Sequence, residues 1–109
     1  MKDNSLQTNN TEKIRKEYSE KIVTGGNSIH TVLDAAGPVT NYLYDYYSKY
    51  YIEKYANFNK EDVVLDFGCG LGRLSEKYAP FVKRIVAVDL SSELIDLAKS
   101  NSVNKSNVS

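Results

Sequence analysis

The spacing of hydrophobic residues along the chain predicts helices in its first half and strands in its second. Between Glu12 and Val23, three apolar residues, Ile14, Tyr18 and Ile22, recur every four positions, which is the spacing of one face of an amphipathic helix. Thr11 can cap this helix, because its hydroxyl can accept a hydrogen bond from a free amide of the first turn. A Gly-Gly-Asn run follows, so we expect the helix to end near residue 23.

A second helix is predicted from about Thr40, after a Gly-Pro turn, to Phe58. It carries one charged stripe, Asp45, Lys49 and Glu53, with the four-residue spacing that brings opposite charges together on a helix surface. We expect this stripe to face water. The rest of the helix is rich in tyrosine: Tyr42, Tyr44, Tyr46, Tyr47, Tyr50, Tyr51 and Tyr55. We expect these rings to pack in the core or in a lid, with a substrate cage as the alternative.

Residues 63–89 have the pattern of a strand, a helix and a second strand. Val63–Leu65 and Arg84–Val88 are short β-branched runs, typical of strands that are buried on both faces of a parallel sheet. Between them lie a glycine-rich turn, Asp66–Gly72, and a short helix, Arg73–Tyr78. A crossover of this length joins parallel strands, so we expect one right-handed βαβ unit.

The residues after this unit predict one more helix and the entry to a third strand. Ser91 can cap a helix from Ser92 to about Lys99, with Leu94, Ile95 and Ala98 on its buried side. Residues 107–109 then resemble the beginning of a strand. The whole pattern indicates an α/β fold.

Composition narrows the classes of protein that this pattern can serve. The chain has 14 basic residues (Lys and Arg together) and 14 acidic residues (Asp and Glu together). It therefore lacks the excess of basic residues that binding to nucleic acids or anionic membranes usually requires. The single cysteine, Cys69, can form neither an internal disulfide nor a cysteine metal site, which favours the cytoplasm. No run approaches about 18 apolar residues and the first residues lack a signal-peptide pattern, so neither a membrane span nor secretion is expected.

The strongest chemical signal is the glycine-rich turn between the first strand and its helix. Gly68, Gly70 and Gly72 lack Cβ atoms, so the backbone can turn sharply and its amides can approach a ligand. Asp89 ends the second strand 21 residues after Gly68, where a carboxylate can accept hydrogen bonds from both hydroxyls of a ribose. The two motifs together predict a site for a nucleoside.

The spacing within the turn indicates which nucleoside cofactor it binds. A dinucleotide fingerprint starting at Gly68 needs glycine at position 73, where this sequence has Arg73. A carboxylate, Asp66, stands just before the turn. It would repel a pyrophosphate but attract the ammonium group of a methionine moiety. The charge therefore favours a cofactor that contains methionine.

The residues that carry these motifs, Val64–Arg73 and Ile85–Ser91, with Leu94, Ile95 and Ala98, resemble the first third of a class I S-adenosylmethionine-dependent methyltransferase. The resemblance implies a Rossmann-like α/β fold and S-adenosyl-L-methionine as the cofactor. It implies six cofactor-binding residues: Asp66, Gly68, Cys69 and Gly70 for the methionine part, Asp89 for the ribose and Leu90 for the adenine. It identifies no catalytic residue and no metal ligand.

The resemblance also implies how the chain is divided. Residues 1–10 are expected to be a disordered tail, 11–59 a helical lid or cap, and 60–109 the first part of the cofactor-binding domain. A complete fold of the family has more strands than these residues supply, so we expect a fold truncated after the second strand and its following helix. Methyl transfer, to an acceptor expected to be a small molecule, would then need the complete protein, and the 109-residue chain alone would be inactive.

Other interpretations stay open at this point. The chain could belong to a dinucleotide-binding oxidoreductase, against which Arg73 argues, or to a non-catalytic binding or interaction module. Cys69 lies within the glycine turn with no histidine near it in sequence, so we interpret it as a packing residue and not as a nucleophile. His30, the single histidine, is interpreted as structural, with a general base as the alternative.

Overall fold

The computed structural model describes residues 4–29, 33 and 37–109, and His30 lies outside these described residues. The elements are helices α1 (Asn4–Gly25), α3 (Pro38–Tyr55), α4 (Arg73–Tyr78) and α5 (Ser92–Asn101), a 3₁₀ turn η1 (Ala79–Phe81), and strands β1 (Val63–Phe67) and β2 (Arg84–Val88). Within this described part, no helix is both long and apolar enough to cross a membrane.

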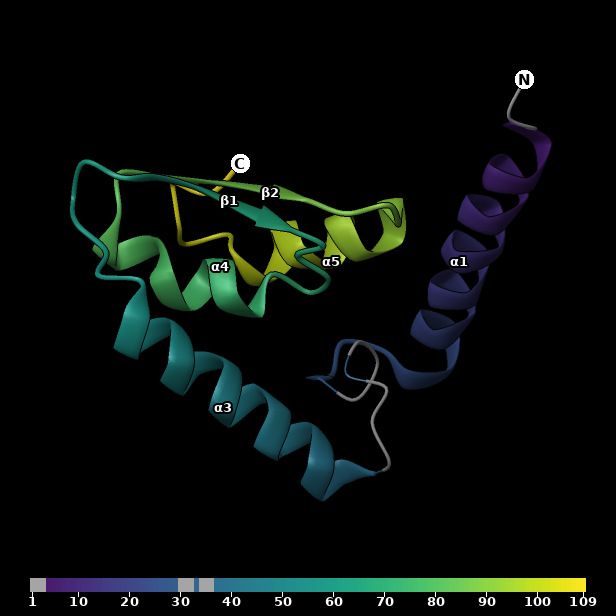
Figure 1. The fold of residues 1–109 in the computed structure, drawn as a ribbon, viewed down its shortest axis with the longest axis horizontal. Coiled ribbons are helices and arrows are strands. Elements are labelled where there is room, and N and C mark those ends of the chain that lie inside the picture. Colours follow the sequence, from purple (N-terminus) through teal and green to yellow (C-terminus); the bar gives the residue numbers. More distant parts are fainter. Residues whose placement is uncertain (1–3, 30–32, 34–36) are drawn as a thin grey trace.

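The strands form a two-stranded parallel sheet, with α4 as the crossover between them. The register pairs Val63 with Arg84 at one end and Phe67 with Val88 at the other. Helices α4 and α5 lie on one face of the sheet, α3 lies beyond α4, and α1 stands past the carboxyl ends of the strands (Figure 1). The predicted α/β strand-helix-strand unit is therefore confirmed.

The last residues of the chain continue the sheet on the free side of β2. Val108 forms a parallel bridge with Ile85. The amide of Ile85 donates to the carbonyl of Asn107 at 2.9 Å, and the amide of Ser109 donates to the carbonyl of Ile85 at 3.0 Å. The predicted entry to a third strand is thus present, and β2 lies between it and β1.

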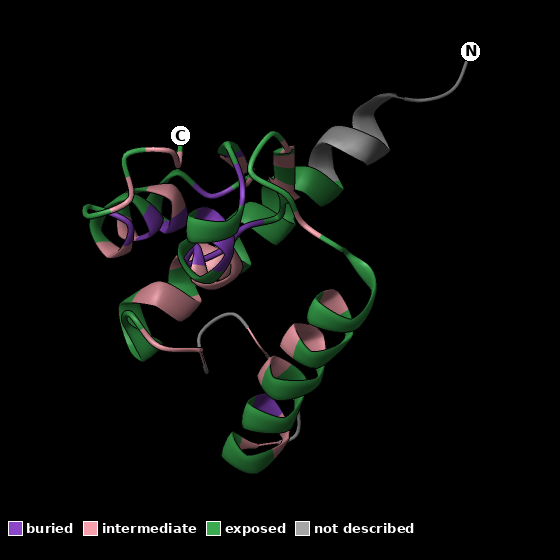
Figure 2. Cartoon of the chain, turned by 90° about the vertical axis from the view of Figure 1, so that its left-hand side faces the viewer, coloured by how far each residue is buried: buried purple, intermediate pink, exposed green. Residues whose placement is uncertain are grey.

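The core lies between the sheet and the helices that cover it. Tyr78, Ala79, Val82 and Ile85 are buried together, and they are packed against by Ile52, Phe58, Val64, Leu74 and Val108. Most of the buried residues lie between Cys69 and Ser102, while α3 and residues 10–25 of α1 are largely exposed (Figure 2). The core therefore lies near the beginnings of the two strands, to which Val64 and Ile85 belong.

Strand β1 is buried on one face only, so the prediction that both faces are buried is wrong. Val63, Leu65 and Phe67 are 63%, 61% and 85% exposed, whereas the alternate residue Val64 packs against the core. Successive side chains of a strand point to opposite faces of the sheet. Among the described residues the helices cover only the face that Val64 shares, which explains the difference.

Helix α1 begins at Asn4, and not near residue 12 as the hydrophobic pattern predicted. Residues 4–10, expected to belong to a disordered tail, continue the helix. Extending an existing helix adds one backbone hydrogen bond for each residue that is fixed, which favours its continuation through these polar residues. The predicted end is close, because the helix stops at Gly25 and Gly26 adopts a φ of 61°.

The charged stripe of α3 is directed toward helix α4, whereas the prediction placed it in water: Asp45 and Lys49 are partly buried, and Glu53 remains exposed. Asp45 forms an ion pair with Arg73 at 2.6 Å, and Glu53 forms one with Lys77 at 2.7 Å. The carboxylates turn toward α4 because that helix presents two cations four residues apart. The seven tyrosines of α3 are correspondingly exposed and not in the core. Several stack along the helix, as Tyr51 and Tyr55 do with ring centroids 6.3 Å apart.

Candidate functional site

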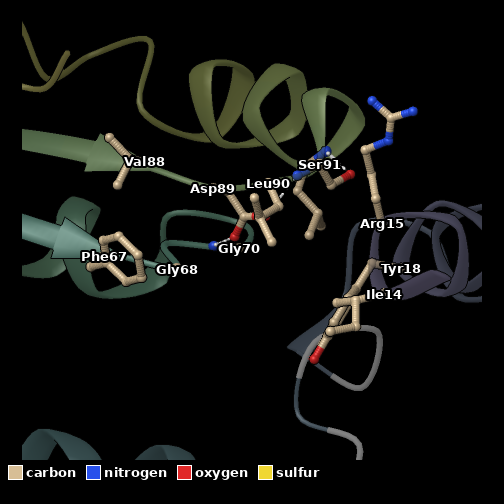
Figure 3. A pocket seen from close by; sticks show the side chains of 11 residues that line it. Ile14, Arg15, Tyr18, Phe67, Gly68, Gly70, Val88, Asp89, Leu90 and Ser91 are labelled. Atoms are coloured by element: carbon tan, nitrogen blue, oxygen red, sulfur yellow. Dashed lines mark hydrogen bonds between the residues drawn. The ribbon is translucent and has the colours of Figure 1, made fainter. Parts of the chain in front are cut away.

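A cavity of about 410 Å³ lies at the carboxyl ends of β1 and β2. One wall consists of Phe67, Gly68 and Gly70 after the first strand, and a second wall consists of Asp89 and Leu90 after the second strand. Figure 3 shows these residues converging from the two strand ends, with α1 on the opposite side. In open parallel sheets, ligands bind in the crevice outside these strand ends.

The glycine turn has a backbone that needs glycine. Gly68, Gly70 and Gly72 have φ angles of 76°, 54° and 74°, which residues with a Cβ rarely adopt. The amides of Gly68 and Cys69 both donate to the carbonyl of Val88, at 2.8 and 2.9 Å. The turn is therefore bound to the end of β2, with its position fixed by the neighbouring strand.

Two of these glycines have different surroundings. A Cβ added to Gly68 would meet nothing within 4 Å, and Gly68 lines the cavity. A Cβ added to Gly72 would lie 3.2 Å from the Cβ of Ala98 in α5. Gly68 thus leaves space on the cavity side of the turn, while Gly72 allows α4 and α5 to pack closely.

Asp89 connects the ends of both strands to helix α5. Its Oδ2 accepts a hydrogen bond from the amide of Gly70 at 2.8 Å, and its Oδ1 accepts one from the amide of Ser91 at 3.0 Å. Ser91 caps α5, because its hydroxyl accepts from the amide of Leu94 at 3.2 Å. An ionised carboxylate has about four acceptor positions, so Asp89 can still accept hydrogen bonds from a ligand in the cavity.

Four of the six predicted cofactor-binding residues line the cavity, namely Gly68, Gly70, Asp89 and Leu90. Asp66 and Cys69 are outside the lining. The carboxylate of Asp66 accepts a hydrogen bond from the hydroxyl of buried Ser75 in α4, at 2.7 Å. Asp66 therefore holds the start of the crossover helix against the end of β1.

Cys69 is buried in the glycine turn, and its thiol is a weaker acid than an ordinary cysteine thiol. Burial, reinforced by the negative charges of Asp66 and Asp89, raises the pKa of this thiol to about 11. A nucleophilic cysteine needs the opposite shift, because the thiolate is the reactive form. The interpretation of Cys69 as a packing residue agrees with this environment.

Helix α1 supplies a wall of the cavity that the sequence reasoning missed. Ile14, Arg15 and Tyr18 face the strand ends across the cavity (Figure 3). Arg15 is paired with Glu12 at 2.8 Å, and the ammonium group of Lys21 lies 4.9 Å from the centre of the Tyr18 ring. The four-residue spacing of Ile14 and Tyr18 was a usable signal, but it predicted only an apolar helix face.

The end of α1 is attached to both α5 and the glycine turn through two asparagines. The side-chain amides of Asn27 and Asn101 donate to each other at 2.7 and 3.0 Å. The amide of Asn101 also donates to the carbonyl of Leu71, at 2.9 Å. These contacts fix the α1 wall relative to the turn.

Comparison with known proteins identifies the domain. Residues 64–109 match the family model described as a methyltransferase domain. In a structure of phosphoethanolamine N-methyltransferase 1 from Haemonchus contortus, crystallised with phosphoethanolamine and S-adenosylhomocysteine, the likeness covers 96% of this chain and 21% of that one. The TM-score is 0.76 at 15% identity, which shows a shared fold. The YcgJ protein from Bacillus subtilis gives a TM-score of 0.55 at 29% identity, over 58% of this chain and 28% of that one.

Two curated relatives match shorter stretches. An uncharacterized RNA methyltransferase from Oceanobacillus iheyensis is 40% identical over 48 residues, and N-demethylindolmycin N-methyltransferase from Streptomyces griseus is 49% identical over 41 residues. The aligned stretches span 44% and 34% of this chain but only 10% and 16% of those relatives. Residues 64–109 match a methyltransferase domain, and the fold is part of the Rossmann-like fold of class I S-adenosylmethionine-dependent methyltransferases. The predicted resemblance is confirmed.

Proposed function

We propose that the chain forms the first part of the S-adenosylmethionine site of a methyltransferase. The observation that carries this proposal is the position of Asp89, which accepts from the amide of Gly70 and lines the same cavity as Gly68 and Leu90. A ribose placed at Asp89 would have the glycine turn on one side and the exposed side chain of Leu90 on the other. These are the places that the methionine and adenine parts would take.

The charges around the turn favour a cationic ligand. Burial is the main cause of the raised pKa of the Cys69 thiol, and the negative charges of Asp66 and Asp89 add to it. The same negative field would attract the ammonium and sulfonium groups of S-adenosylmethionine and repel a pyrophosphate. The space in front of Gly68, which any Cβ would occupy, suits close approach of the methionine part. The assignment of Asp66 and Cys69 to that part stays a prediction, since neither lines the cavity.

The cofactor supplies an activated methyl group on its sulfonium, so the protein's task is to position it and to exclude water. The residues of this chain that would do so are Asp89 for the ribose, Gly68 and Gly70 for the methionine part, and Leu90 for the adenine. Apolar side chains of α1, Ile14 among them, would limit the access of water from the opposite wall.

For the acceptor we propose a small molecule. One relative is named for an indolmycin derivative and another for RNA, so the family does not decide between these substrates. The equal numbers of basic and acidic residues argue against RNA, which a basic surface would attract. Because the chain spans about a fifth of the phosphoethanolamine N-methyltransferase chain, we expect no methyl transfer by these 109 residues alone.

The decisive experiment is a comparison of ligands by isothermal titration calorimetry and thermal shift. We expect S-adenosylhomocysteine to bind and to raise the melting temperature, and NAD to do neither. Binding of NAD in preference to S-adenosylhomocysteine would overturn the proposal in favour of an oxidoreductase. Binding of neither would leave an interaction module as the better function. Radiolabelled methyl transfer by the isolated chain would overturn only the expectation of inactivity.

A further inference from the structure

An ion pair joins helix α3 to the end of the glycine turn. The guanidinium of Arg73 donates to Oδ1 of Asp45 at 2.6 Å, across 28 positions of sequence. The two side chains are only 20% and 17% exposed. The other oxygen of Asp45, Oδ2, accepts from the ammonium group of Lys49 at 2.6 Å. Asp45 is thus a partly buried anion between two cations, which makes its charge more consequential than that of a surface pair.

Arg73 occupies a special place, because it is the first residue of α4 and directly follows Gly72. The amide of Gly72 donates to the carbonyl of Cys69 at 2.9 Å, and the carbonyl of Gly72 accepts from the amide of Glu76 at 2.8 Å. Movement of Arg73 would therefore be transmitted to Gly72 and to the turn before it. The ion pair between Arg73 and Asp45 therefore restrains the cofactor turn from the side opposite the strands.

Other contacts between α3 and α4 lie farther along both helices. Lys77 pairs with Glu53 at 2.7 Å, and both side chains are more exposed than Asp45 and Arg73. The hydroxyl of Tyr78 donates to the carbonyl of Lys49 at 3.2 Å. These contacts join the two helices one turn of α4 beyond Arg73. Loss of the Asp45 carboxylate would consequently leave α3 and α4 in contact through Lys77 and Tyr78. It would free only the first residue of α4, next to the glycine turn.

We propose that Asp45 is a positioning residue for the cofactor site, acting on the glycine turn through Arg73. This inference rests on the proposed function of that turn. Helix α3 then has a part in cofactor binding although none of its residues lines the cavity beside Asp89. Without the carboxylate, Arg73 would be a partly buried cation without its partner and would move toward water. Gly72 and the preceding amides would lose their fixed positions.

The test compares Asp45→Asn with a control, Glu53→Gln, which removes a charge from the same face of α3 at the distal pair. Calorimetry measures the affinity for S-adenosylhomocysteine, and nuclear magnetic resonance measures the chemical shifts and exchange of the amides of residues 68–72. We expect Asp45→Asn to weaken binding by about 2- to 30-fold and to speed amide exchange in the turn. Glu53→Gln should change the affinity and the amide exchange less than Asp45→Asn does, even if it lowers the melting temperature.

Arg73→Lys is the second variant, because lysine keeps the charge but lacks the planar, multi-donor guanidinium. It should reproduce the effect on the turn amides, and Asp45→Glu should partly restore both readouts. If Asp45→Asn does not fold, Arg73→Lys decides the question by the same criteria. Unchanged affinity and unchanged turn amides in the folded variants would overturn the inference. A wild-type chain that fails to bind S-adenosylhomocysteine, while the variants still alter the turn amides, would contradict the proposed function alone.

Discussion

Asp89 and Gly70, 19 positions apart in the sequence, are joined by a hydrogen bond of 2.8 Å from the glycine amide to the carboxylate. The bond links the turn after the first strand to the residue after the second. The second oxygen of Asp89 accepts from Ser91, so the same side chain also fixes the start of α5. A group that organises both strand ends is well placed to orient a ligand between them, and replacing it should affect folding and binding together.

We expect Asp89→Asn to weaken binding of S-adenosylhomocysteine by about 1–3 kcal/mol, because a charged hydrogen-bond acceptor is lost from a partly buried site. The asparagine side chain has nearly the same shape as that of aspartate and keeps one acceptor oxygen, so the variant should fold. Calorimetry measures the affinity and urea denaturation the stability. Asp96→Asn, at an exposed position of α5, is the matched control and should leave the affinity unaltered. Equal affinity for Asp89→Asn and the wild type would remove Asp89 from the proposed site.

Gly68→Ala and Gly72→Ala should separate binding from packing. Both place a Cβ at a positive φ, at a cost of about 1–2 kcal/mol. The Gly68 methyl group would enter open space in the cavity and interfere with ligand, whereas the Gly72 methyl group would press on Ala98. We therefore expect Gly68→Ala to lose more affinity and Gly72→Ala to lose more stability. The opposite order, from calorimetry and urea denaturation, would mean that Gly68 does not face the ligand.

The distal pair between α3 and α4 should make stability depend on acid. The hydrogen bond from Lys77, with some opposition from burial, lowers the pKa of Glu53 below its ordinary value of 4.5. A lowered folded-state pKa contributes stability that is present above the unfolded value and is lost as the pH falls through the folded value. The difference in urea midpoint between wild type and Glu53→Gln should hence be present at neutral pH and shrink below pH 4.5. A difference that persists in acid would show that the pair is not its cause.

Cys69 should react slowly with thiol reagents in the folded chain. With a thiol pKa raised to about 11 by burial, little thiolate is present at neutral pH. Unfolding in urea should restore the ordinary pKa near 9.0 and accelerate alkylation. Because the unfolded thiol loses its proton first, the contribution of this group to stability is full below pH 9 and declines toward pH 11. Fast alkylation of the native chain at neutral pH would contradict the buried position.

The parts of the fold that follow local rules could be predicted from the sequence. Helix α4 and strand β2 have the predicted bounds, and Ser91 caps α5 as expected, because caps, glycine turns and short β-branched runs act over a few residues. Within the site, the glycine turn and the place of Asp89 after the second strand pointed to Gly68, Gly70 and Asp89, and the family resemblance pointed to Leu90. These four residues line one cavity.

The errors concern faces whose partners are distant in sequence. The stripe containing Asp45 was expected in water because one helix does not reveal that Arg73, 28 positions later, will lie against it. The apolar sequence of strand β1 predicted burial on both faces of the sheet, yet Phe67 is exposed. The sequence placed Ile14 on the apolar face of a helix but did not show that it lines a cavity. Periodicity indicates an apolar face and not what lies beside it.

The arrangement of tyrosines on α3 gives the chain a localised optical label. It has no tryptophan, and seven of its nine tyrosines belong to this helix, with Tyr18 and Tyr78 as the other two. Ultraviolet absorbance and emission therefore come mainly from the exposed surface of this helix, which includes the Tyr51 and Tyr55 pair. Quenching by a dissolved ion would register what covers that surface, and near-ultraviolet circular dichroism would register the order of its rings. The chain can thus be observed at α3 without an introduced probe.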